Sequence, residues 1–255
     1  MTSATQLFDL SGKVAVVTGG SRGLGREMVL AFAHAGADVV IASRRLDSCE
    51  RLAEEVTRTT GRAVLPVACH VGDWNQVEQL AEAAYARFGK VDVLVNNAGM
   101  SPIYEHVNDV TEALYDKVLD VNMKGAFRLS ALVGTRMAAG DGGSIINVSS
   151  TASMHPRANV IPYAAAKAGL NAMTIGFAHA FGPKVRVNCI IPGPFLTDIA
   201  DAWDMEGFNA RAAETIFLQR GGQPNEIVGA ALYFASAASS FTTGALLTVS
   251  GGSGM

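Results

Sequence analysis

The stretch Val14-Ala15-Val16-Val17-Thr18-Gly19-Gly20-Ser21-Arg22-Gly23-Leu24-Gly25 predicts a strand, a glycine-rich turn and the entry to a helix. The β-branched run before Gly19 is typical of a buried strand, and helical spacing continues over residues 26–35. Glycines let backbone amides approach a phosphate closely, and the dipole of the following helix favours an anion. Because the spacing is Gly-x-x-x-Gly-x-Gly and not the commonest dinucleotide fingerprint, a plain strand-to-helix turn stays open as an alternative.

Alternating strand and helix patterns extend from this stretch to the end of the chain. Strands are predicted at residues 14–19, 38–43, 63–71, 91–95, 143–150, 185–191 and 245–249, and helices at 26–35, 46–60, 74–88, 111–137, 160–181 and 224–235. This order predicts an α/β fold, a doubly wound parallel sheet of seven strands with helices on both faces. At 255 residues the chain suits one domain over 1–255, and ligands of such sheets bind beyond the carboxyl ends of the strands.

The composition excludes several classes of function. The net charge is −3 and no long basic run occurs, so we expect no nucleic-acid partner. No apolar run approaches the roughly eighteen residues that cross a membrane, and the N-terminal residues lack a secretion signal, so we expect a cytoplasmic protein without a membrane partner. Cys49, Cys69 and Cys189 lie far apart without a Cys-x-x-Cys pair, which predicts reduced packing residues and no metal site.

The candidate chemical centre is the segment 150–167, which leaves an apolar strand and enters an alanine-rich helix. Tyr163 and Lys167 are four residues apart, which places both on one face of that helix. An unperturbed phenol has a pKa of about 10, and an ammonium about 4 Å away stabilises the phenolate by at most roughly 4 kcal/mol, or about three pKa units. Such a tyrosine can exchange a proton with a carbonyl or carbinol oxygen near neutral pH. Taken alone, the spacing is also typical of a half-buried aromatic beside a solvated amine.

The end of the second predicted strand indicates which dinucleotide the chain binds. An NAD-binding protein places an acid there, about twenty residues after the glycine turn, to hold the adenosine 2′-hydroxyl. In this chain Ser43 and Arg44 stand at that place, and Ser21 and Arg22 lie on the glycine turn. Guanidinium and hydroxyl groups suit a 2′-phosphate, so we expect NADP(H) to be preferred, with NAD(H) possible. Arg45 is as compatible with a solvated charge at a helix start.

Further motifs follow other strands. Asn96-Asn97-Ala98-Gly99 comes after the fourth predicted strand, and Pro192-Gly193-Pro194 closes the sixth, ahead of the hydroxyl of Thr197. Asn122 is a polar residue among apolar neighbours, where its amide either bonds to backbone or holds a water. Residues 198–219 combine aromatic side chains with acids and have no strong strand or helix pattern, which favours a mobile lid over the substrate.

These motifs, in this order, resemble the short-chain dehydrogenase/reductase family over essentially the whole chain. The resemblance is closest to the branch that includes 3-oxoacyl-[acyl-carrier-protein] reductases and small sugar or steroid alcohol dehydrogenases. The glycine turn, residues 96–99 and residues 192–197 are similar to its cofactor-binding motifs. Asn122, Ser150, Tyr163 and Lys167 are similar to its catalytic tetrad. Ser150 is preferred to Ser149 because it precedes Tyr163 by the family spacing.

The resemblance implies a Rossmann fold and a role for each residue of the tetrad. Tyr163 is the general acid in reduction and the base in oxidation, and Ser150 polarises the substrate oxygen. Lys167 lowers the pKa of the tyrosine and binds the nicotinamide ribose, and Asn122 anchors a relay water. The cofactor-binding residues that it implies, together with those found above, are Gly19, Ser21, Arg22, Gly23, Leu24, Gly25, Ser43, Arg44, His70, Val71, Asn97, Ala98, Gly99, Tyr163, Lys167, Pro192, Gly193, Phe195 and Thr197. The family also implies a homotetramer or homodimer built from the two long helices.

The expected function is therefore that of an NADP(H)-dependent oxidoreductase. It transfers a hydride between nicotinamide and a carbonyl or secondary alcohol, such as a 3-oxoacyl thioester, a ketone or a sugar. A non-enzymatic dinucleotide-sensing protein is the alternative, although a sensor does not require an intact tetrad. A methyl-donor transferase fits the glycine turn and not the 2′-phosphate pair. Two residues depart from the family pattern: His70 stands where Asp or Asn is frequent near the adenine, and Ser250 replaces an acid.

Overall fold

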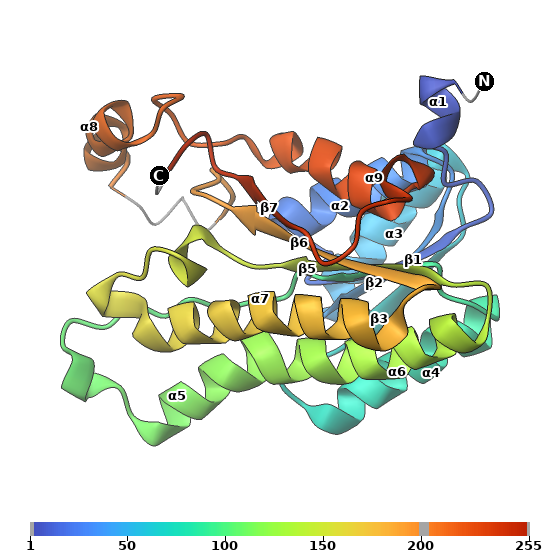
Figure 1. Cartoon of the computed structure of the whole chain (residues 1–255), viewed down its shortest axis with the longest axis horizontal. Coiled ribbons are helices and arrows are strands. Elements are labelled where there is room, and N and C mark those ends of the chain that lie inside the picture. Colours follow the sequence, from blue (N-terminus) through green and yellow to red (C-terminus); the bar gives the residue numbers. More distant parts are fainter. Residues whose placement is uncertain (1–2, 199–203, 254–255) are drawn as a thin grey trace.

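A seven-stranded parallel sheet runs through the part of the chain that the computed structural model describes, residues 3–198 and 204–253 (Figure 1). The strand order is β3-β2-β1-β4-β5-β6-β7, so the direction of strand addition reverses between β1 and β4. The predicted doubly wound α/β sheet is confirmed. The strands are β1 (Val14–Thr18), β2 (Asp38–Ser43), β3 (Val64–Ala68), β4 (Val93–Asn96), β5 (Gly143–Val148), β6 (Val185–Pro192) and β7 (Leu246–Val249).

Helices cover both faces of the sheet. Helices α2, α3 and α9 lie on one face, and α4, α6 and α7 lie on the other (Figure 1). The α-helices are α1 (Ala4–Leu7), α2 (Gly23–His34), α3 (Leu46–Thr60), α4 (Trp74–Phe88), α5 (Glu112–Leu119), α6 (Gly125–Ala139), α7 (Ile161–Phe181), α8 (Met205–Thr215) and α9 (Val228–Ala235). Short 3-10 turns are η1 (Val107–Asp109), η3 (Thr151–Ser153), η4 (Ala158–Val160), η6 (Pro224–Ile227) and η7 (Ala237–Ser239). None of the described helices is both long and apolar enough to cross a membrane.

Strand β1 shows why the sheet is buried on both sides. Its side chains point alternately to the two faces, as in any strand. Ala15 and Val17 join the core that contains Phe32 of α2, while Val16 joins the core that contains Leu129 of α6. All five β1 residues are buried. The glycine turn that follows β1 is therefore attached to a central strand that is held from both sides.

The helix predicted at residues 111–137 is interrupted. A π-helical segment, η2 (Asp120–Lys124), separates α5 from α6, and the amide of Gly125 donates to the carbonyl of Asp120. At Gly125 the chain approaches the backbone after β3 so closely that an added Cβ would lie 2.0 Å from the carbonyl oxygen of Val71. The prediction of one continuous helix was wrong because this long-range packing leaves no signal in the local periodicity.

Gly125→Ala should lower the free energy of unfolding by about 1–3 kcal/mol, because the new methyl group forces the backbone near Val71 to move. Urea unfolding followed by circular dichroism measures the change. Gly229→Ala, on the exposed side of α9, is the matched control, since nothing lies within 4 Å of its Cβ position. The free energy of unfolding of the control should rise by about 0.5–1 kcal/mol, because alanine is a better helix former than glycine. Equal behaviour of the two variants would contradict the close packing at Gly125.

Two boundaries near the candidate site also differ from prediction. Helix α2 begins at Gly23, three residues before the predicted start, so the last glycines of the turn belong to its first turn. Residues 198–219, predicted as an irregular lid, contain α8, whose start is capped by the carboxylate of Asp204 accepting from the amide of Gly207 at 3.1 Å. The part of the predicted lid at 199–203 lies outside the described residues. The end of the segment is tied down, because the amide of Leu218 donates to the carbonyl of Gly251 at 2.9 Å.

Candidate active site

The parallel register brings the predicted site residues to one edge of the sheet. Asn96 of β4 pairs with Asn147 of β5, and Val148 of β5 pairs with Ile190 of β6. Because all strands are parallel, their carboxyl ends lie at the same edge. The glycine turn, residues 97–99, Ser150 and the loop after β6 therefore surround one crevice, at the point where the strand order reverses.

Thr18 and Asn97 join the glycine turn to the end of β4. The Thr18 hydroxyl accepts hydrogen bonds from the amides of Asn97 and Ala98 at 3.1 and 3.2 Å, and it donates to the carbonyl of Val95. The Asn97 side chain donates to the carbonyls of Thr18 and Gly19 at 3.0 and 3.1 Å. Asn97 thus holds the backbone of the cradle, in addition to its predicted place in the cofactor site. Thr18 was quoted in the turn motif without a role, which only its cross-strand partners reveal.

The glycine turn has the shape of an anion cradle. Gly19 has a positive φ of 63°, which glycine adopts readily. A Cβ on Gly25 would lie 2.2 Å from the Gly19 carbonyl oxygen, so the turn folds back tightly on the first turn of α2. The free amides at this helix N-terminus attract negative charge. The local structure therefore fits the pyrophosphate of a dinucleotide, and it excludes side chains at these positions.

The end of β2 carries hydroxyl and guanidinium groups in place of an acid. The Ser21 hydroxyl donates to the Ser43 hydroxyl at 3.0 Å, which brings the glycine turn and the end of β2 together as predicted. Arg44 is exposed, and no residue that the structure describes forms an ion pair with it. Arg45 instead pairs with Asp47 at 3.0 Å. Arg44 is therefore available for a phosphate, and Arg45 is the solvated helix-start charge that the sequence also allowed.

Arg22 has a partner from a distant part of the chain. Its Nη1 atom lies 2.8 Å from Oδ2 of Asp198, which directly follows Thr197 in the loop after β6. A Cβ on Gly23 would lie 3.4 Å from Cγ2 of Thr197. The loop after β6 thus reaches across the crevice to the glycine turn. This contact brings the two predicted cofactor-binding segments together, and Asp198 is a residue that the sequence did not single out.

His70 and Val71 form the turn between β3 and α4. The His70 amide donates to the Gln76 side chain at 2.9 Å, and its Nδ1 atom accepts a hydrogen bond from the Gly72 amide at 3.2 Å. The His70 side chain thereby closes the turn by accepting from the amide two residues later.

Tyr163 lies in the first turn of α7, half-buried and beside Ser150. Burial raises the pKa of Tyr163 above its ordinary value, and the hydrogen bond with Ser150 offsets part of that rise. The Ser150 hydroxyl also accepts from the amide of Ala152 at 3.1 Å, which fixes its position at the end of β5. Ser149 points elsewhere, since its hydroxyl is buried and donates to the Lys167 carbonyl. The structure therefore supports the choice of Ser150.

Lys167 is buried beneath the tyrosine. Its Nζ atom donates to the carbonyl of Val148 at 2.7 Å and lies 5.8 Å from the centre of the Tyr163 ring. Burial lowers the pKa of Lys167 to about 8. Burial raises the pKa of Tyr163 above its ordinary value in the structure, and the expected lowering of that pKa by Lys167 stays a prediction. The spacing of four residues correctly placed the two side chains together, whereas the balance of charge and burial depends on the packing around them.

The Asn122 side chain is buried in the π-helical segment and fully engaged with backbone. Its Oδ1 atom accepts from the Met100 amide at 3.1 Å, and its Nδ2 atom donates to the carbonyls of Met100 and Val118 at 2.9 Å each. Of the two readings that the sequence left open for this amide, backbone bonding is the one observed. A Cβ on Gly99 would lie 2.9 Å from Asn122 Oδ1 and 3.5 Å from Lys167 Nζ. Asn122 thus pins the loop after β4 beside the buried amine.

Tyr104 also joins this loop to the site, which the sequence did not predict. Its hydroxyl accepts a hydrogen bond from the amide of Ile161, the first residue of α7, at 2.8 Å. A side chain 57 residues away thereby satisfies one of the free amides at the helix start. Beside it, Ile103 and Val107 expose 73% and 59% of their surface. The rim around the entrance to α7 therefore exposes these two apolar side chains, together with the polar Glu105 and His106.

The loop after β6 packs on the C-terminal residues. The Gly193 amide donates to the Val249 carbonyl at 3.0 Å, and a Cβ on Gly193 would lie 2.8 Å from the Cα atom of Ser250. Phe195 is buried and pairs by a parallel bridge with Gly222. Ser250 thus supports the predicted cofactor loop from behind. Pro192, at the end of β6, places this loop at the same edge as the other predicted residues.

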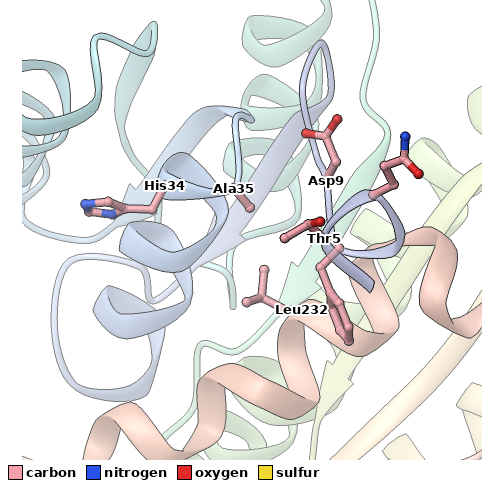
Figure 2. A pocket seen from close by; sticks show the side chains of 7 residues that line it. Thr5, Asp9, His34, Ala35 and Leu232 are labelled. Carbon is pink, nitrogen blue, oxygen red and sulfur yellow. The ribbon is translucent and has the colours of Figure 1, made fainter. Parts of the chain in front are cut away.

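The described residues hold no cluster of three or more His, Cys, Asp or Glu side chains that could bind a metal ion. Cys49, Cys69 and Cys189 are free and buried. A surface hollow lies elsewhere, beside α1, the end of α2 and α9 (Figure 2). It is lined by Thr5, Gln6, Phe8, Asp9, His34, Ala35 and Leu232. Since His34 and Ala35 mark the end of α2 opposite the glycine turn, this hollow is separate from the crevice.

Comparisons with known proteins agree with this geometry. The short chain dehydrogenase family profile matches residues 13–206. The 7alpha-hydroxysteroid dehydrogenase of Escherichia coli K12 is 34% identical over 95% of this chain and 94% of its own length. A solved 7α-hydroxysteroid dehydrogenase, complexed with NADH and 7-oxo glycochenodeoxycholic acid, superposes with a TM-score of 0.93 at 33% identity, covering 99% of this chain and 98% of that one. A 3-oxoacyl (acyl-carrier-protein) reductase from Agrobacterium tumefaciens C58 with NADP bound gives 0.92 at 30% identity, covering 98% and 97%.

Proposed function

The chain belongs to the short-chain dehydrogenase family of oxidoreductases, which act on hydroxyl and carbonyl groups, and on this premise we propose that it interconverts a ketone and a secondary alcohol with NADP(H). The observation that carries the proposal is the convergence of Tyr163 and Ser150 with the buried amine of Lys167, which lies 5.8 Å from the centre of the Tyr163 ring. A dinucleotide-sensing protein would need the cradle alone. The tyrosine, serine and lysine would then have no reason to converge at the crevice.

Each catalytic residue has a task that its contacts support. Tyr163 gives its proton to the carbonyl oxygen in reduction and takes it back in oxidation. Ser150, held by the Ala152 amide, orients that oxygen. Lys167 supplies positive charge beneath the phenol and binds the ribose of the dinucleotide. Asn122 holds the loop after β4 in place. The nicotinamide supplies or accepts the hydride, so the chain contributes position, charge and proton transfer.

The cofactor preference rests on the end of β2. Solved relatives of this chain carry NADH in one case and NADP in another, so the family alone leaves the choice open. The hydroxyls of Ser21 and Ser43 and the unpaired guanidinium of Arg44 suit a 2′-phosphate. No carboxylate follows β2 to bind a ribose hydroxyl, and Asp47 is held by Arg45 and Arg51. We therefore assign NADP(H) as the preferred cofactor and NAD(H) as the weaker one.

Arg44→Ala should raise the apparent KM for NADPH by about 10- to 100-fold, because a hydrogen-bonded charge contributes about 1.5–3 kcal/mol. The apparent KM for NADH should change little, since NADH has no 2′-phosphate. Steady-state kinetics with each cofactor, at a fixed saturating ketone, measures both values. Arg45→Ala is the matched control, because its guanidinium is occupied by Asp47. Equal rises for NADPH and NADH in the Arg44 variant would overturn the phosphate assignment.

The substrate that best fits the rim is an apolar ketone. Exposed Ile103 and Val107 lie on the loop that Tyr104 fastens to α7, and Met154 and Ile161 on the other side of Tyr163 are each 44% exposed. These side chains cannot form hydrogen bonds with the hydroxyl groups of a sugar. One solved relative is complexed with a ketone, 7-oxo glycochenodeoxycholic acid. A panel of steroid ketones, aliphatic ketones, keto-sugars and 3-oxoacyl thioesters, followed by NADPH absorbance, tests the assignment. Turnover of the keto-sugars alone would contradict it.

We also propose that two or four copies assemble through α5, α6 and α7. Phe127 of α6 and Ile175 of α7 expose 43% and 44% of their surface, and Phe127 stacks near Phe177 with ring centres 5.6 Å apart. Exposed apolar side chains along two adjacent helices are typical of a subunit interface. Light scattering coupled to size-exclusion chromatography distinguishes a monomer from the proposed assemblies.

A further inference from the structure

The ion pair between Arg22 and Asp198 crosses the crevice that the dinucleotide is proposed to enter. Arg22 lies on the glycine turn, and Asp198 lies in the loop after β6, 176 residues later. Nη1 and Oδ2 are 2.8 Å apart. The pair therefore connects the phosphate side of the crevice with its nicotinamide side.

The Asp198 carboxylate also lies beside the N-terminus of α2. Arg22 is the N-cap residue of this helix, and its side chain makes no capping hydrogen bond. A Cβ on Gly23, the first helical residue, would lie 3.5 Å from Oδ1 of Asp198. A helix N-terminus attracts anions through its free amides and its dipole. Asp198 thus places a negative charge at the position where a phosphate of the cofactor would be favoured.

The pair is exposed enough to be exchanged. The side chains of Arg22 and Asp198 retain 65% and 41% of their accessible surface. Exposed ion pairs contribute little net stability, because water and salt compete with them. A phosphate brings more charge and more acceptor oxygens than a carboxylate, and it can form paired hydrogen bonds with a guanidinium. Arg22 can therefore leave Asp198 for a phosphate at small cost.

We propose that Asp198 is an internal competitor of the cofactor's phosphate groups. Its carboxylate holds Arg22, so that dinucleotide binding exchanges the Arg22–Asp198 ion pair for an Arg22–phosphate pair. Asp198 then influences the affinity for NADPH without itself binding the cofactor. Arg44 has no ion pair among the described residues, so it can bind a phosphate without first leaving a partner. This inference rests on the proposed function, because it takes the crevice as the dinucleotide site.

Asp198→Asn should lower the Kd for NADPH by about three- to fivefold, the range expected when an exposed ion pair no longer has to be broken. NADH should also gain, because it carries the pyrophosphate, but it should gain less than NADPH because it lacks the 2′-phosphate that is expected to bind Arg22. Isothermal titration calorimetry of the full chain with each dinucleotide measures the four constants. Asp141→Asn is the matched control for net charge, because Asp141 is exposed and precedes β5 at the opposite edge of the sheet. Its Kd values should equal those of the wild type.

A double-mutant comparison tests whether Asp198 acts through Arg22. In the Arg22→Gln background, Asp198→Asn should bring a clearly smaller gain in NADPH affinity, because only the charge of the carboxylate at the N-terminus of α2 is left to remove. An undiminished gain there would overturn the proposed exchange, and so would an Asp198→Asn variant that binds NADPH no more tightly than the wild type. In either case, binding and turnover by the wild type would leave the proposed function intact. A wild type that binds neither dinucleotide would overturn both.

Discussion

Tyr163→Phe should lower kcat for ketone reduction by about 10³-fold, the middle of the range for loss of a positioned proton donor. The substitution removes one hydroxyl and keeps the ring packed against α7. Without the hydroxyl, the substrate oxygen has no acid, and Ser150 loses its hydrogen-bond partner. The measurement is single-turnover oxidation of bound NADPH with saturating ketone. The affinity for NADPH should match that of the wild type, which separates lost chemistry from lost binding.

Tyr233→Phe is the matched control, because it removes the same atom from a residue of α9 whose hydroxyl bonds to Thr242. Its kcat should equal that of the wild type. Thermal unfolding of both variants checks that neither has lost its fold. A Tyr163→Phe variant that keeps an undiminished rate would contradict the proton-transfer role of Tyr163.

Lys167→Met should lower kcat/KM for the dinucleotide by about 10²-fold. This factor corresponds to about 2.7 kcal/mol, which is less than the roughly 4 kcal/mol that an ammonium can contribute next to the developing charge on the phenol. Methionine keeps the unbranched shape of the buried stem while removing the charge. The pH profile gives the sharper test. Burial lowers the pKa of Lys167 to about 8, so the amine loses its proton as the pH rises through that value. In the wild type, kcat/KM for NADPH in the reduction direction should fall with rising pH near 8.

In Lys167→Met that inflection should be absent, while the loss of activity remains at lower pH. Retention of the inflection near pH 8 would assign it to another group. Lys184→Met is a control, because this exposed lysine donates to the Gly140 carbonyl at the far edge of the sheet. Its pH profile should match that of the wild type.

The same titration has a consequence for stability. The Lys167 amine has a pKa of about 8 in the folded chain and an ordinary value of 10.5. Between these values the unfolded chain binds the proton and the folded chain does not, so this residue makes the free energy of unfolding rise with pH. Below about pH 8 both states are protonated, and the cost of the buried charge is constant. Lys167→Met should lose this part of the pH dependence in urea unfolding.

The sequence was informative wherever the chemistry depends on neighbours along the chain. The alternation of strands and helices predicted the seven-stranded doubly wound sheet. The spacing of Tyr163 and Lys167 placed the phenol and the amine on one face of α7. The hydroxyl and guanidinium residues after β2 were brought beside the glycine turn, as the Ser21–Ser43 hydrogen bond shows. Each of these features follows from a residue pattern within one strand, one turn or one helix, or from the order of these elements. Such patterns can be read directly from the sequence.

Other features depended on contacts between distant segments. The π-helical break at residues 120–124 accompanies the close approach of Gly125 to Val71, which no local period encodes. The Tyr104–Ile161 hydrogen bond joins a loop to a helix start 57 residues later. Helix α8 formed in a segment whose pattern was weak, where the Asp204 cap supports the first turn.

The sequence by itself determined the fold class, because the alternation of strands and helices is a property of the chain, and its motif spacing predicted which residues meet at the carboxyl edge of the sheet. Only the tertiary structure decided how those residues behave. The pKa of Tyr163 lies above its ordinary value and that of Lys167 below it, because burial disfavours the charged form of each. Arg22 is held by a carboxylate 176 residues away. Burial and long-range charge arise from the folded packing, and so they cannot be read from spacing.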